Sequence, residues 1–145
     1  YEPKVIKDLG KLVYYVMDNV PWVNTASPVY QEANALFNKK YGGYLDTNSG
    51  YAYTGILVIA DALERAGSAD SNKLLAAIRT TDLKAQPMVG DAIRFAANGD
   101  NINAATAMVQ VLPDPDPVKR VKVVLPKSFA QADYVFPAPQ MWDRG

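Results

Sequence analysis

The stretch that decides the fold is residues 51–67, which read YAYTGILVIADALERAG. Its first ten residues carry no charge, and the charged side chains come only towards its end: Asp61, Glu64 and Arg65. A helix that is apolar nearly all round is buried on more than one side, whereas a surface helix keeps one polar face. The pattern predicts a helix over 51–66, ended by a glycine cap at Gly67, whose N-terminal half lies deep in a protein.

Further elements are predicted on both sides of this helix. Three more helices have clear start or stop signals: 3–9 with a cap at Gly10, 28–41 after Ser27-Pro28, and a helix capped by Asp70 or Ser71 that ends near Thr81. Four strands are predicted: 12–17, buried on both faces and broken by 18–22; 92–95 and 107–112, around the turn at 98–100; and 120–125. Residues 113–117 alternate proline with aspartate and predict an exposed connector.

The C-terminal segment, 126–145, has prolines at 126, 137 and 139, which disfavour long regular elements. It nevertheless keeps five large apolar side chains: Phe129, Tyr134, Phe136, Met141 and Trp142. We expect this segment to pack along a larger body.

Composition excludes several classes of function. The chain has 145 residues, the size of one domain or less, and its 15 basic residues balance 15 acidic ones, so no positive field favours nucleic acid. It has no cysteine and no histidine, which removes the commonest nucleophiles, general bases and metal ligands. The longest apolar runs are far below the roughly 18 residues that span a bilayer. We therefore expect no enzyme, no cofactor and no metal.

Two stretches of polar residues have some features of a metal site. Asp114 and Asp116 stand between prolines, and 98–103 superficially resembles a calcium loop but lacks its alternating carboxylates and closing glutamate. A solvated turn is the favoured interpretation of the first, and a hairpin turn of the second.

Aromatic residues give the candidate site. Tyr51 and Tyr53 stand at the start of the predicted helix, where free amides favour an anion such as a carboxylate and a ring can wall a small-molecule pocket. Trp22, beside Pro21, is a third candidate. The alternative for all three is packing in the core or at its rim.

The string SGYAYTG at 49–55, followed by IADALERAG at 59–67, resembles the late segment of type I periplasmic solute-binding proteins, the leucine/isoleucine/valine-binding-protein family of ABC importers. Other stretches resemble the family in the same order: Pro21-Trp22, FNKKYG at 37–42, TTDL at 80–83, GDAIRF at 90–95, GDN at 99–101, Gln110, VVLP at 123–126 and FPAPQMW at 136–142. Thr54-Gly55 after Tyr53 departs from the family's commoner Tyr-Asp-Ala.

The resemblance implies an α/β fold, part of a two-lobe periplasmic-binding-protein type I fold with Rossmann-like lobes, helices, short buried strands and a β-hairpin, incomplete by itself. Residues 1–17 would end the second lobe, 18–112 would complete the first lobe, and 113–145 would cross back to the second. The chain opens without an initiator Met or an apolar leader, so we expect a cut boundary there.

The implied function is extracytoplasmic binding, in a bacterial periplasm, of an amino acid or similar small carboxylate or amide between the lobes. Tyr53 would border the cleft, and the partners would be an ABC permease and the complementary N-terminal portion of the same protein.

A ligand-sensing receptor or regulatory domain of the same fold is the alternative, and a self-contained α/β enzyme or assembly module is a third. Isolated residues 1–145 should expose large apolar patches, so we expect a complementary chain, a swapped copy or cleaved residues to cover them.

Overall fold

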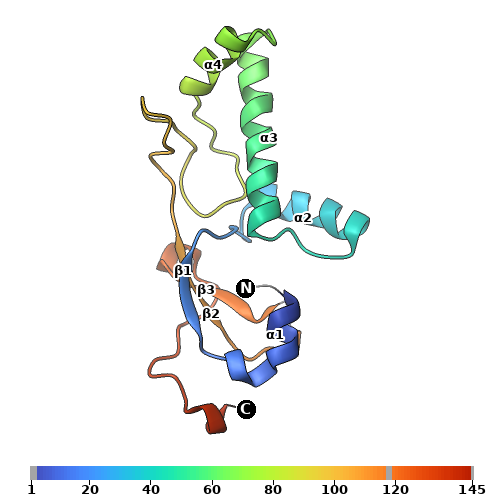
Figure 1. Cartoon of the computed structure of the whole chain (residues 1–145), viewed down its shortest axis with the longest axis vertical. Helices are drawn as coiled ribbons and strands as arrows, with labels where there is room; N and C mark the ends of the chain where they lie inside the picture. The colour runs from blue at the N-terminus through green and yellow to red at the C-terminus, as the bar shows by residue number, and fades with distance from the viewer. Residues whose placement is uncertain (1–2, 117–118, 145) are drawn as a thin grey trace. The chain divides into compact units, whose positions relative to one another are not determined.

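The computed structural model describes residues 3–116 and 119–144 of the chain (Figure 1). The chain divides into two compact units: unit 1 comprises Tyr1–Val20 and Ala107–Gly145, and unit 2 comprises Pro21–Thr106. The backbone therefore crosses from one unit to the other twice, after Val20 and after Thr106.

Unit 1 is built on a small antiparallel sheet with the strand order β1-β2-β3. Its elements are helix α1 (Pro3–Leu9), the 3-10 helix η1 (Gly10–Val13), strands β1 (Met17–Val20), β2 (Ala107–Val111) and β3 (Val121–Leu125), and the 3-10 helices η3 (Lys127–Phe129) and η4 (Met141–Asp143). In the β1–β2 ladder Met17 lies opposite Gln110, and Val20 lies opposite Ala107. The central strand β2 is almost wholly buried, so this sheet forms the core of unit 1.

The strand predicted over 12–17 is wrong. Residues 10–13 form a 3-10 helix, and the strand begins only at Met17. Tyr15 has a φ of +68°, which turns the backbone out of the extended conformation just before pairing starts. Asp18 and Asn19, which were expected to break the strand, lie on it with exposed side chains, because β1 is an edge strand and polar residues there can face solvent.

Unit 2 consists of three helices and irregular segments joined by isolated β-bridges. Helix α2 spans Pro28–Tyr41, α3 spans Thr47–Ala66 and α4 spans Ser71–Arg79 (Figure 1). Gly42 and Gly67 end α2 and α3 in the left-handed conformation, with φ of +72° and +57°. The Asp70 carboxylate accepts hydrogen bonds from the amides of Asn72 and Lys73 and so caps α4. The glycine ends of α2 and α3 and the Asp70 cap of α4 confirm the sequence-based predictions.

Two predictions about helix starts in unit 2 are wrong. Helix α3 begins at Thr47 and not at residue 51, because the Asp46 carboxylate caps it by accepting from the Ser49 amide at 2.8 Å. The Ser27 hydroxyl does not cap α2; it donates to the carbonyl of Gln86 instead.

Residues 92–95 do not form a strand but make isolated bridges at Ile93 and Phe95. Asparagine side chains take the place of a ladder there: Asn103 donates to the Ala92 carbonyl at 2.6 Å, and Asn101 accepts from the Arg94 amide. Side-chain bonds of this kind compete with regular strand pairing.

Helix α3 is buried along one stripe, which repeats every four residues: Gly50, Thr54, Val58 and Ala62. A second apolar face, formed by Ile56, Ile59 and Leu63, is exposed, and Ile56 reaches 63% exposure. Within the described residues α3 is therefore buried on one side only, and the expectation that this chain exposes apolar patches is confirmed. The C-terminal segment likewise exposes Phe136 and Trp142, the latter at 78%. Among the described residues, no helix is both long and apolar enough to cross a membrane.

Candidate functional site

Trp22 and Tyr53 both pack against a single cluster of buried side chains in unit 2. The cluster consists of Val23, Tyr30, Ala33, Leu45 and Met88, and Phe37 packs against it as well. Two backbone hydrogen bonds hold the segment after Pro21 beside residues 87–89: Val89 donates to the Trp22 carbonyl, and Asn24 donates to the Pro87 carbonyl, each at 2.8 Å. The structure thus brings together two of the three candidate residues.

Gly50 fixes how closely α3 approaches this cluster. A Cβ atom at Gly50 would lie 2.9 Å from Cγ1 of Val23 and 3.0 Å from Sδ of Met88. Such distances are shorter than side chains tolerate in a packed interior, so only glycine fits here. This contact seats the first turn of α3 on the cluster, and Tyr53 follows one turn later, half-buried against it.

Tyr51 lies elsewhere. Its side chain is 49% exposed and lines a cavity of about 60 Å³ with Thr54 of the same helix and with residues from 86–105. Partial burial raises the pKa of the Tyr51 phenol above its ordinary value. The cavity has room for about two water molecules at their volume in the liquid, far less than an amino acid needs. Tyr51 therefore does not join Tyr53 and Trp22 in one wall.

Neither Tyr51 nor Tyr53 stands at the N-terminus of α3. Because α3 starts at Thr47, its first amides lie before Tyr51, and the Asp46 carboxylate occupies that end of the helix. The anion that the helix N-terminus favours is thus supplied by the chain itself. Tyr53 remains a candidate because its aromatic ring packs against the buried cluster.

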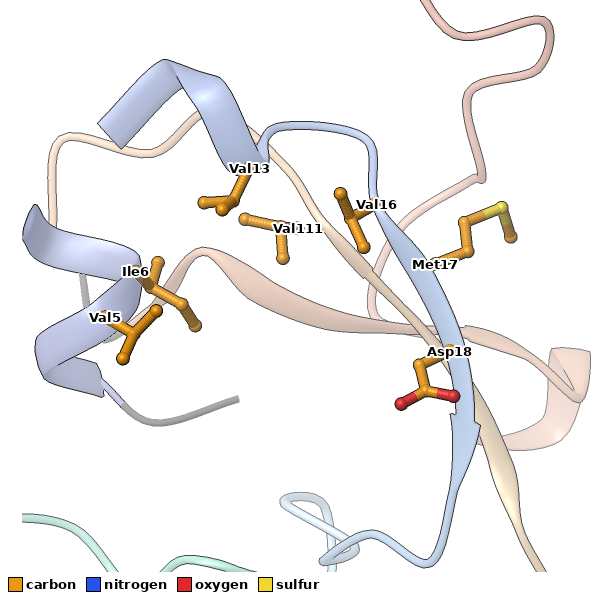
Figure 2. A pocket seen from close by; sticks show the side chains of 7 residues that line it. All are labelled: Val5, Ile6, Val13, Val16, Met17, Asp18 and Val111. Carbon is orange, nitrogen blue, oxygen red and sulfur yellow. The ribbon is translucent and has the colours of Figure 1, made fainter. Parts of the chain in front are cut away.

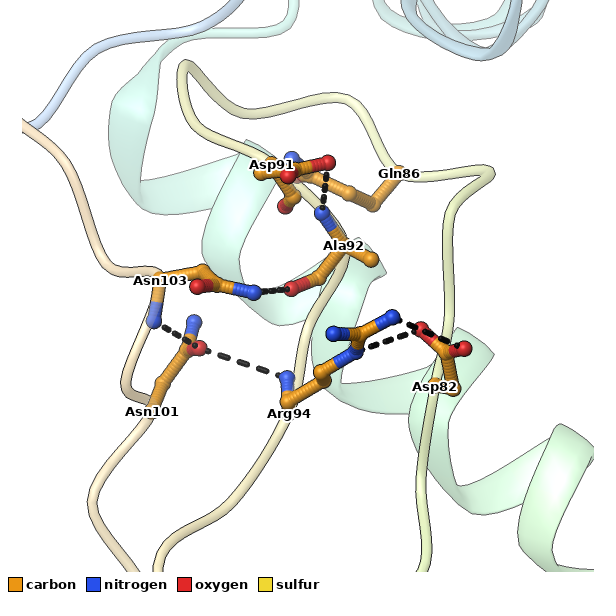
Figure 3. A network of polar contacts seen from close by, with 7 residues as sticks. All are labelled: Asp82, Gln86, Asp91, Ala92, Arg94, Asn101 and Asn103. Carbon is orange, nitrogen blue, oxygen red and sulfur yellow. Dashed lines mark hydrogen bonds and ion pairs between the residues drawn. The ribbon is translucent and has the colours of Figure 1, made fainter.

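Several residues that line the cavity beside Tyr51 belong to a polar network, among them Gln86, Asp91, Asn101 and Asn103 (Figure 3). The buried Gln86 side chain accepts from the Met88 amide at 2.7 Å and donates to the carbonyls of Met88 and Asp91. Asn103 closes the other side by its bond to the Ala92 carbonyl. Gln86 was not singled out from the sequence, since no short motif marks a glutamine that folds back on its own loop. The side-chain bonds of Gln86 and Asn103 go to backbone groups of these same loops and so hold the loops in place.

Arg94 and Asp82 form an exposed ion pair next to this network, with Nε and Nη2 of Arg94 at 2.8 and 3.1 Å from the two carboxylate oxygens (Figure 3). The hydrogen bonds from Arg94 hold the pKa of Asp82 below its ordinary value, and the same bonds raise the pKa of Arg94. The pair joins two loop segments of unit 2.

Unit 1 contains a larger groove of about 420 Å³ (Figure 2). Its lining is apolar except for one carboxylate: Val5, Ile6, Val13, Val16, Met17, Val111 and Asp18. An amino acid carries an ammonium and a carboxylate, and the single carboxylate of Asp18 matches only the first of these charges. The groove is better described as an apolar surface than as a site for a charged ligand.

Asp114, in the connector at 113–117, has partners other than a metal ion. Among the described residues, no group of three or more Asp, Glu, His or Cys side chains could hold a metal ion. Asp114 accepts from the Asp116 amide at 2.9 Å and lies 3.4 Å from Nζ of Lys122. The backbone hydrogen bond and then Lys122 lower the pKa of Asp114.

Comparison with known proteins gives the family. The family model described as "periplasmic binding protein" matches residues 1–114. Among solved structures, a leucine-binding protein LivK from Thermotoga maritima is 26% identical with a TM-score of 0.61, the match covering 76% of this chain and 31% of that one. A putative branched-chain amino acid ABC transporter from Silicibacter pomeroyi is 14% identical with a TM-score of 0.68, covering 91% and 37%. No curated protein matches the chain.

The chain spans about a third of the length of these two solved proteins. Its helices, short strands and small antiparallel sheet match part of the type I periplasmic-binding-protein fold. Because the family model extends over most of the sequence, from the first residue into the connector after β2, the chain belongs to the periplasmic binding protein family.

Proposed function

We propose that this chain is part of the extracytoplasmic solute-binding component of an ABC importer, which binds a branched-chain or similar small amino acid between two lobes. The observation that carries the proposal is the family match over residues 1–114. The likeness to a leucine-binding protein at 26% identity supports the ligand class. A binding role without chemistry also agrees with a sequence that has neither histidine nor cysteine.

The two units supply the basis for a hinge. Val20 and Ala107, the last residue before one crossing and the first after the other, are partners in the β1–β2 ladder. Where the backbone crosses twice at one pair of strands, the two units can rotate about that pair with changes in only a few backbone dihedral angles. In this proposal residues 1–17 end the second lobe, 18–112 complete the first lobe and 113–145 return to the second. Ligand contacts made only in the closed state would favour closure.

Tyr53 is the proposed apolar wall of the cleft, with Trp22 beside it on the same cluster. Tyr51 is the weaker candidate, because it lines the separate small cavity. The polar groups that hold the ligand's carboxylate would come from the remainder of the protein.

The complementary N-terminal portion of the protein is the proposed cover for two apolar surfaces. One is the exposed face of α3, where Ile56, Ile59 and Leu63 follow helical spacing, and the other is the unit 1 groove. Burial of each large apolar side chain contributes about 1.5–3 kcal/mol. The permease is the further partner, and the periplasm is the proposed location.

The test is calorimetric titration of the complete protein with leucine, isoleucine and valine, and with aspartate and lysine as controls. Saturable binding of the first three at lower concentration than the controls is expected. Tight binding of a charged amino acid without binding of leucine, isoleucine or valine would overturn the proposed ligand class.

A further inference from the structure

Gln110 is a buried glutamine of β2 whose side chain ties three segments of unit 1 together. It is 0% exposed. Its Nε2 donates to the carbonyls of Tyr15 and Val135 at 3.2 and 3.0 Å, and its Oε1 accepts from the Val135 amide at 2.9 Å. The two bonds with Val135 reproduce what a neighbouring strand would exchange with it, so the side chain acts as a strand partner for the C-terminal segment.

Gln110 belongs to the β1–β2 ladder, which leads to the two crossings between the units. Gln110 lies opposite Met17, and the same ladder runs on to the pair Val20 and Ala107, where both crossings to unit 2 begin. Tyr15, which Gln110 also holds, is a non-glycine residue at a φ of +68°. A residue in that conformation persists only where its surroundings fix it, and here its amide donates to the Val111 carbonyl at 2.6 Å.

A second anchor lies near the end of the C-terminal segment. Arg144 donates from Nε to the Pro139 carbonyl and from Nη1 to the Leu12 carbonyl, and its guanidinium lies 5.9 Å from the centre of the Tyr15 ring. The stretch from Val135 to Arg144 is therefore fastened at one end to Gln110 of β2 and at the other end to Leu12 and Tyr15, which precede β1.

Packing alone does not account for a glutamine at this position. A buried amide is unfavourable unless its hydrogen bonds are made, and an apolar side chain of similar volume would fill the space without needing partners. All three bonds of Gln110 go to backbone groups outside β2, and two of them reach the C-terminal segment.

We propose that Gln110 is a positioning residue for lobe closure: it couples the C-terminal segment to the paired strands on which the two lobes turn. This inference rests on the proposed two-lobe binding function. Without the Gln110 bonds the C-terminal segment would no longer be held against the β1–β2 ladder. The two lobes would then sample a wider range of separations.

The experiment compares Q110M with Q86M in the complete protein. Gln86 is a fair control because it is also a buried glutamine with three side-chain bonds to backbone groups, but all of them lie within unit 2. Spin labels attached to K11C and K39C report the distribution of distances between the units, because Lys11 and Lys39 are exposed lysines, one in each unit. This chain has no cysteine of its own that would also take a label. Amide exchange at Val135 reports the state of the C-terminal segment.

In Q110M, exchange at Val135 should accelerate by at least about tenfold, the factor that one to two net hydrogen bonds represent, and the distance distribution should broaden. Q86M should change neither. V135P removes the amide that donates to Gln110 without altering the core, and it should broaden the distance distribution as well. If Q110M does not fold, V135P tests the proposed coupling in its place. An unchanged distribution in V135P, or equal broadening in Q86M, would overturn the coupling. Because these distances are measured without ligand, a failed leucine titration is a separate result.

Discussion

Trp22 and Tyr53 pack against the same buried cluster, although one follows the first crossing between the units and the other lies in the second turn of α3. Both rings are partly buried, and an aromatic ring offers an apolar face that suits the side chain of an aliphatic amino acid better than its charged groups.

Y53A in the complete protein should therefore weaken leucine binding by about 1–3 kcal/mol, the usual cost of losing a buried aromatic contact at a binding site. Y53F, which keeps the ring, should bind nearly as well as the original protein. The measurement is calorimetry, and Y41A is the control because Tyr41 is a highly exposed tyrosine of the same unit. Equal affinities for Y53A and Y41A would remove Tyr53 from the site.

G50A should destabilise the chain by about 1–3 kcal/mol, because the added methyl would overlap Val23 and Met88 and overpacking of this kind outweighs the better helix propensity of alanine. G55A lies in the same helix with open space around its Cβ and should stabilise the chain by about 0.5–1 kcal/mol. Urea unfolding of the two variants checks the opposite signs. A stabilising G50A would mean that α3 does not approach the cluster this closely.

D46A should cost about 0.5–2 kcal/mol, because the Ser49 amide loses the carboxylate that caps α3. D46N, which can still accept that bond, should keep most of the stability. Thermal unfolding followed by circular dichroism distinguishes them. If both variants match the original chain, the helix starts later than Thr47, as the sequence alone indicated.

The ion pair of Asp82 and Arg94 predicts a dependence of stability on pH. The pKa of Asp82 is lower in the folded chain than in the unfolded one, so the pair's contribution is complete above the unfolded pKa and is lost as the pH falls through the folded pKa. D82N should remove that part of the acid sensitivity, and R94Q should return the pKa of Asp82 towards its ordinary value. Carboxyl titration by NMR measures the second effect, and an unmoved Asp82 resonance in R94Q would contradict it.

Local signals in the sequence were sufficient for most of the helices. Gly42, Gly67 and Asp70 determine helix ends by interactions within a few residues, and such signals can be recognised without knowledge of the tertiary structure. The family could likewise be recognised from the ordered strings around residues 49–67.

Elements that depend on distant partners were not predictable in the same way. The strand at Met17 starts where it does because Tyr15 is held by Val111 and Gln110, which are remote in sequence. Asn101 and Asn103 replace a ladder beside 92–95 through bonds that no periodicity reveals. The separation of Tyr51 from Tyr53 is different, because side chains two residues apart in a helix do not face each other and the predicted helix over 51–66 already implied this.

The pairing of Val20 with Ala107 has a topological consequence. Strands β1 and β2 are antiparallel neighbours, as the two strands of a β-hairpin are. All of unit 2 lies between them in the sequence, in the position that the turn of a hairpin occupies. A two-residue Asn-Gly turn between these partners would close the hairpin with the twist that antiparallel strands favour. Unit 2 is thus an inserted module, and excising it should leave the strand order of unit 1 unchanged.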